Sequence, residues 1–146
     1  LFEWLKKIKF VAYGDAKGSG RAKLDYNKMI TVPIKKVSNS IEKAFKNIVN
    51  YIRYKKFHNV DTLFLERLIE AMIFDVYFPE EIKAANAEVL KHLTNLPELN
   101  DKQTEKEKLA IIEKVKKELS DPKHPVSIAM FRMESVEEVR IIEGRE

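Results

Sequence analysis

The pattern of apolar and polar positions changes near residue 40. From there apolar residues recur at i, i+3, i+4, i+7 and i+8, which predicts an amphipathic helix over residues 40–52, capped by Ser38 or Ser40. The predicted buried stripe consists of Ile41, Ala44, Phe45, Ile48, Val49 and Ile52. The predicted solvent face carries Lys43, Lys46, Asn47, Asn50 and Arg53.

A second helix is predicted from Asp61, as N-cap, to the residue before Pro79. Its broad apolar face contains Leu65, Leu68, Ile69, Met72, Ile73, Val76 and Tyr77, and the helical spacing also predicts core positions for Phe64, Phe74 and Phe78. Pro79, followed by Glu80 and Glu81, is typical of a helix start, so we expect a third helix that reaches Leu93.

The C-terminal part shows two further helical patterns. Residues 95–104 form a polar loop, and residues 105–119 predict a solvent-facing helix in which Lys and Glu alternate around Leu109, Ile112, Val115 and Leu119. The prolines near residue 123 indicate a turn, residues 126–133 predict a short helix, and the pattern leaves residues 135–142 undecided.

Residues 1–35 lack this helical period. Three of the four glycines lie in residues 14–20, and an extended run follows at residues 29–34, which is typical of short strands or turns. We therefore expect a mainly α protein. A helical, bundle-like lobe over residues 37–146 follows a short β/loop segment over residues 1–36.

Composition narrows the class of protein. With 45% hydrophobic residues the chain should fold, and no apolar run approaches the roughly 20 residues that span a bilayer, so no membrane partner is expected. The chain has no cysteine, and its three histidines are scattered, so no metal site is predicted. No signal peptide is recognisable, which favours the cytoplasm. Because the chain opens at Leu1, directly in an apolar and basic stretch, we expect a piece of a longer protein.

Charge is unevenly distributed along the chain. Residues 1–59 hold 14 Lys and Arg against 4 Asp and Glu, whereas residues 60–146 hold 13 against 19. A basic segment joined to an acidic one suggests one surface for a polyanion, with double-stranded DNA as the first candidate, and another for a different partner. A solvated surface without a ligand is the alternative.

The glycine cluster is a candidate phosphate site. Gly14, Gly18 and Gly20 permit close approach of the backbone to a ligand, and cations stand beside them at Lys17, Arg21 and Lys23. The order of residues matches neither a P-loop nor a dinucleotide-binding motif. A flexible turn between two strands explains the same residues.

No catalytic constellation is found. Residues 79–83 contain the acidic residues and lysine of a metal-dependent nuclease motif, but without the spacing that such a site requires. A proline and acidic residues in the first turn of a helix explain them better. Residues 121–123 are better explained as a turn, and His124 as a loop residue. We therefore predict no catalytic residue.

Two stretches in this order resemble the C-terminal region of adenine-specific DNA methyltransferases of restriction–modification systems, including the bifunctional type IIG group. Residues 63–82 (LFLERLIEAMIFDVYFPEEI) are similar to a helical segment after the target recognition domain. Residues 18–24 (GSGRAKL) and 30–34 (ITVPI) resemble the end of that domain. The resemblance covers about residues 14–85. The Asn/Asp-Pro-Pro-Tyr/Phe motif that acts on the flipped adenine is absent, so no catalytic role carries over.

The resemblance implies a DNA-positioning fragment of a larger methyltransferase or restriction enzyme. S-adenosylmethionine would bind to the parent protein and not to this chain, and the parent's catalytic methyltransferase domain would be a second partner. Together with the charge pattern, the expected DNA-binding residues are Lys17, Gly18, Gly20, Arg21, Lys23, Lys43, Lys46 and Arg53. The alternatives are a helical interaction or homodimerisation module without DNA binding, and an independent enzyme.

Overall fold

The computed structural model describes residues 35–145, and the regular elements in this range are all helices. They are α3 (Asn39–Phe57), α4 (Leu63–Tyr77), α5 (Pro79–Ala84), the 3₁₀ helix η1 (Leu90–His92), α6 (Glu105–Leu119), α7 (Pro125–Met133) and α8 (Glu137–Ile142). The mainly helical class is confirmed for these residues. The predicted β/loop segment lies, up to residue 34, outside the described part of the chain.

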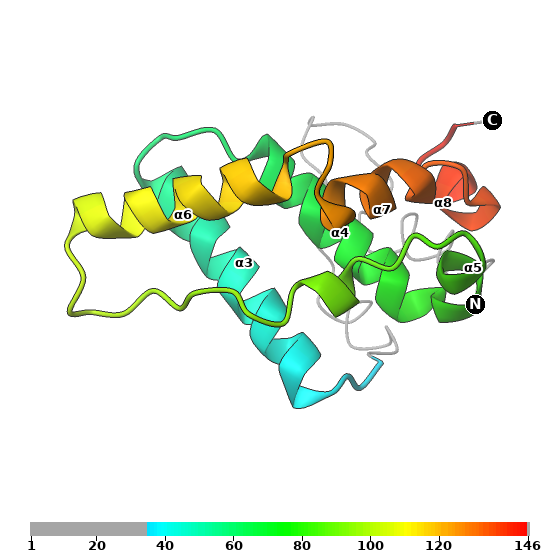
Figure 1. Cartoon of the computed structure of the whole chain (residues 1–146), viewed down its shortest axis with the longest axis horizontal. Helices are drawn as coiled ribbons and strands as arrows, with labels where there is room; N and C mark the ends of the chain where they lie inside the picture. Colours follow the sequence, from blue (N-terminus) through cyan, green and yellow to red (C-terminus); the bar gives the residue numbers. More distant parts are fainter. Residues whose placement is uncertain (1–34, 146) are drawn as a thin grey trace, which may run out of the picture.

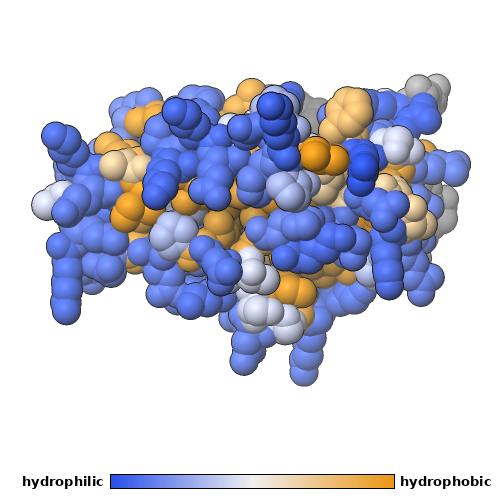
Figure 2. All heavy atoms as spheres, in the orientation of Figure 1, coloured by the Kyte–Doolittle hydropathy of each residue, from blue (hydrophilic) through white to orange (hydrophobic). Residues whose placement is uncertain are grey.

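The helices enclose a core built around α4. This helix packs against α3, α5 and α7, and α6 packs against α7. In Figure 1, residues 93–104 cross the molecule in front of α3, and α6 then runs back toward α7. We call residues 93–104 the crossing segment. The face drawn in Figure 2 is mainly hydrophilic, with apolar side chains visible between α6 and the crossing segment.

Helix α3 begins as predicted and buries Ala44 and Ile48 as predicted, but the edges of its buried face differ. The Ser38 hydroxyl accepts a hydrogen bond from the Ile41 amide at 3.5 Å. Two predictions are wrong: Asn47, expected in solvent, is buried, and Val49, expected in the core, is 40% exposed. The buried positions continue from Ile48 to Tyr51, whose hydroxyl donates to the carbonyl of Pro97 in the crossing segment. The buried face therefore lies away from Val49.

Helix α4 supplies the centre of the core. Leu65, Leu68 and Met72 are fully buried, as predicted, whereas Ile73 is 44% exposed. The helix begins after Thr62 and not after Asp61, although the Asp61 carboxylate accepts a hydrogen bond from the Leu63 amide at 3.2 Å. Of the predicted core aromatics, Phe78 is buried, while Phe64, Phe74 and Tyr77 are partly buried against the core.

The third helix is much shorter than predicted. α5 ends at Ala84, and Asn86 adopts the left-handed conformation with φ 52°. The chain reaches η1 through an irregular stretch because the buried Asp75 carboxylate accepts hydrogen bonds from the amides of Val89 and Leu90, both at 2.9 Å. A tertiary contact thus replaces the helical hydrogen bonds that the sequence pattern suggested.

The C-terminal helices follow the sequence pattern closely. α6 has the predicted bounds, and its apolar side buries Ile112, Val115 and Leu119 while the charged side faces solvent. The predicted turn is present, with the Asp121 carboxylate accepting from the Lys123 amide at 2.8 Å. The undecided residues 135–142 contain α8. Among the described helices, none is long and apolar enough to cross a membrane.

Candidate functional site

Three of the predicted DNA-binding residues lie on α3. Lys43, Lys46 and Arg53 are exposed, but Lys43 forms an ion pair with Glu98 of the crossing segment at 2.9 Å. This pairing lowers the pKa of the Glu98 carboxyl, mainly through the hydrogen bond from Lys43 and with a smaller contribution from the charge of Lys46. The other predicted residues, Lys17, Gly18, Gly20, Arg21 and Lys23, lie outside the described residues.

The remaining cations near the end of α3 face other elements. Lys55 is buried and its ammonium lies 3.3 Å from a carboxylate oxygen of Glu113 on α6. Lys56 pairs with Glu66 on α4. Within residues 35–145, Lys46 and Arg53 are therefore the predicted DNA-binding residues of α3 that have no ion-pair partner.

The inner side of α3 holds the crossing segment. The Asn47 side-chain amide donates to the carbonyl of Leu96 at 3.3 Å, and the Tyr51 hydroxyl donates to the carbonyl of Pro97. Burial raises the pKa of Tyr51 to about 12, and the charge of Glu98 adds to this effect. Asn47 and Tyr51 thus serve the fold and leave the outer face of α3 to interact with solvent or a ligand.

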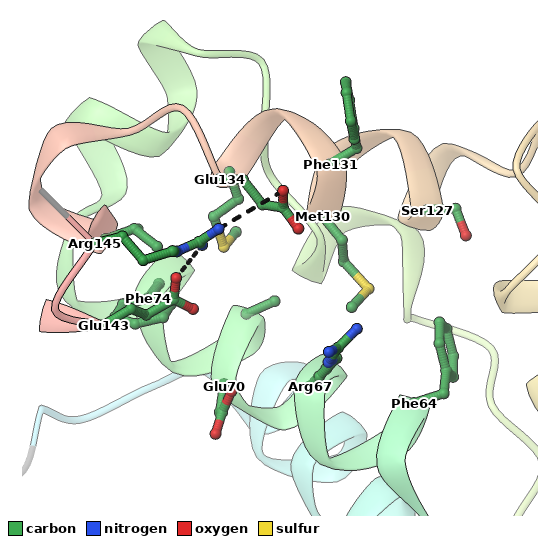
Figure 3. Close-up of a pocket in the computed structure, with 13 residues that line it drawn as sticks. Phe64, Arg67, Glu70, Phe74, Ser127, Met130, Phe131, Glu134, Glu143 and Arg145 are labelled. Atoms are coloured by element: carbon green, nitrogen blue, oxygen red, sulfur yellow. Dashed lines mark hydrogen bonds and ion pairs between the residues drawn. The ribbon is translucent and has the colours of Figure 1, made fainter. Parts of the chain in front are cut away.

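The structure contains a groove that the sequence pattern did not predict. It has a volume of about 560 Å³ and lies between α4 and the helices α7 and α8 (Figure 3). Its apolar lining includes Phe64, Ala71 and Phe74 on α4 and Met130 and Met133 on α7, and nearly half of the lining residues are polar or charged. A volume of this size is typical of binding sites.

The charges at the groove are distributed unequally. In Figure 3 the Arg67 guanidinium points across the groove toward Met130, whereas Glu70 points away from it. At the other end, Arg145 forms an ion pair with Glu134 at 3.8 Å and a hydrogen bond with Glu143. Arg67 has no ion pair or hydrogen bond with any residue of the described range.

Sequence reasoning did not single out Arg67 because it stands between apolar positions of a helix that was assigned to the core. A signal was present, since apolar residues of α4 occur on more sides than one neighbouring helix can cover. Phe64, Arg67, Ala71 and Phe74 follow one another at helical spacing and form one line along α4. This line faces α7, whereas Leu65, Leu68 and Met72 face the core.

The described residues offer no cluster of three His, Cys, Asp or Glu side chains for a metal ion. His124, predicted as a loop residue, is the N-cap of α7, because its Nδ1 accepts a hydrogen bond from the Val126 amide at 3.2 Å. Comparison of the chain with protein-family models, curated proteins and solved structures finds no match.

Proposed function

We propose that this chain is the C-terminal part of a cytoplasmic, site-specific DNA adenine-N6 methyltransferase or restriction–modification enzyme. In this proposal the helical lobe supports the end of the target recognition region and contacts the DNA backbone. S-adenosylmethionine binds to the parent's catalytic domain, which is the second partner of the lobe. The sequence resemblance and the outer face of α3 support the proposal.

The observation that carries the DNA contact is the charge of residues 35–56. This stretch has seven Lys and Arg and a single acidic residue, Glu42, and three of the cations (Lys43, Lys55 and Lys56) pair with carboxylates of other elements. Lys46 and Arg53 are exposed on α3, form no ion pair within the described residues, and lie about 10 Å apart along the helix axis. Unpaired cations of this kind bind phosphates without reading the base sequence.

Binding of a labelled DNA duplex at several salt concentrations tests the proposal. We expect weak binding that falls steeply as salt rises, because phosphate contacts release counterions. Replacing Lys46→Gln and Arg53→Gln together should reduce the slope of log affinity against log salt by about 2. The matched control is Lys114→Gln with Lys117→Gln, two exposed lysines of α6. Absent or salt-independent binding contradicts the proposal, as does an equal effect of the control pair.

Sedimentation with and without DNA separates this function from the alternative of an interaction or homodimerisation module. A DNA-positioning lobe sediments faster when duplex is added. A stable dimer whose sedimentation does not respond to duplex favours the alternative.

A further inference from the structure

The groove between α4 and α7 has the form of a site for a helix. Its α4 wall runs from Phe64 to Phe74, which corresponds to about 15 Å, or almost three helical turns. Ala71, which is 5% exposed, lies between these aromatic residues. Met130 and Met133 line the opposite side, and methionine side chains adapt readily to a bound surface.

The apolar surface continues beyond the groove. Phe131 on α7 is 76% exposed and points away from Arg67 and Met130 in Figure 3, and Ile128, one turn earlier, is 38% exposed. Large apolar side chains that remain in solvent beside an apolar groove are typical of surfaces that bind an amphipathic helix. DNA does not fit this surface, because a phosphate backbone requires cations and not apolar walls.

Charge defines the chemistry of the occupant. At one end Arg145 pairs with both Glu134 and Glu143, so that end keeps one negative charge, and Glu70 points away from the cavity. Arg67 is left as the charged group that points into the groove without a partner in the described residues. A carboxylate is its natural complement, because the guanidinium fork binds carboxylates in a bidentate manner.

We propose that this groove binds an amphipathic helix of a partner protein, with the helix's apolar side against Phe64, Phe74 and Met130 and an acidic side chain against Arg67. The site shares no residue with the DNA-contacting face of α3. Failure of one proposal therefore leaves the other untouched.

Two labelled synthetic peptides of about 15 residues test the site by fluorescence anisotropy. Both carry leucines at i, i+4 and i+7, and they differ in a single Glu or Lys placed beside this stripe. We expect the wild-type chain to bind the Glu peptide about tenfold more tightly, which corresponds to one charge-assisted hydrogen-bonded pair. Arg67→Glu should reverse the preference, and Arg67→Gln should abolish it.

Arg140→Glu is the matched control, because Arg140 is an exposed arginine of α8 that does not line the groove. Met130→Asp should weaken binding of both peptides, and thermal melts verify that each variant folds. An unchanged preference in Arg67→Glu, or no saturable binding of the Glu peptide below about 1 mM, overturns the proposal. Arg67-dependent binding of decanoate without peptide binding would indicate a small-ligand site instead. If Arg67→Glu sediments differently from wild type in the absence of peptide, the occupant is a second copy of the chain. Decanoate binding without peptide binding, or this change of sedimentation, also overturns the proposal.

Discussion

At the scale of single residues, the lobe depends on a few polar side chains that lie in its interior. Asp75 is the clearest case, since its carboxylate is the hydrogen-bond acceptor for two backbone amides at the start of η1. Burial raises the pKa of this carboxyl, and the hydrogen bonds from Leu90 and Val89 oppose the shift without cancelling it. The ionised form is therefore less favourable in the folded state than in the unfolded state.

A pH dependence of stability follows for Asp75. Because its folded-state pKa lies above the unfolded value of about 3.9, the free energy of unfolding should rise as pH falls through the folded pKa and level off below the unfolded one. Asp75→Asn should remove this rise, so its deficit against wild type grows toward low pH. Asp75→Ala should destabilise by about 2–4 kcal/mol at neutral pH, because two amides lose their acceptor.

Urea denaturation of wild type and both variants between neutral and mildly acidic pH measures these effects. Asp101→Asn is the control, since Asp101 is an exposed aspartate. A deficit of Asp75→Asn that shrinks toward low pH would mean that the carboxylate stabilises the fold through its charge, contrary to the burial argument.

At the scale of the element, α6 owes its start to a local motif. The Thr104 hydroxyl accepts from the Glu107 amide at 3.2 Å, and the Glu107 carboxylate accepts from the Thr104 amide at 2.7 Å. This capping box satisfies two amides that would otherwise lack partners. Thr104→Ala should cost about 1 kcal/mol in the free energy of unfolding. Thr94→Ala, at an exposed threonine of the crossing segment, should change it far less, and equal losses in denaturant titrations would contradict the assignment.

Elements that depend on neighbouring residues could be predicted from sequence, and elements that depend on distant contacts could not. α6 and α7 were predictable because capping residues, prolines and apolar spacing within the local sequence determine where they begin, where they end and which side is apolar. The end of α5 was not, since it depends on Asp75, which lies on another helix. The buried face of α3 was shifted for a similar reason, because Asn47 finds its partner 49 residues away in the chain. The groove requires α4 and α7 to lie together, and no local pattern indicates that.

At the scale of the whole molecule, α3 connects the crossing segment with α6. Its inner face binds the crossing segment through Asn47 and Tyr51, and Lys55 reaches α6. Its outer face carries Lys46 and Arg53. A ligand on the outer face therefore acts on a helix whose position is fixed from the inside. In the proposed function, this arrangement lets the lobe hold a DNA-contacting helix rigidly.

The Tyr51 hydroxyl provides a test of this arrangement. Its pKa of about 12 in the folded protein lies above the unfolded value of about 10, so its contribution to stability should be full below pH 10 and disappear as pH rises from about 10 to 12. Tyr51→Phe should therefore be less stable than wild type at neutral pH by about 1 kcal/mol, the net value of one hydrogen bond. Because the two-unit difference in pKa corresponds to about 2.7 kcal/mol, this deficit should disappear between pH 10 and 12 and change sign at higher pH.

The loss of stability in Tyr51→Phe should be greatest in the crossing segment. Trypsin should cleave Tyr51→Phe after the exposed Lys102 about fivefold faster than wild type, because about 1 kcal/mol less free energy opens the segment. Tyr54→Phe is the matched control, because the Tyr54 hydroxyl has no hydrogen-bond partner within residues 35–145. If both phenylalanine variants are cleaved equally fast, the hydroxyl of Tyr51 does not hold the crossing segment. In that case apolar packing alone holds the segment against α3.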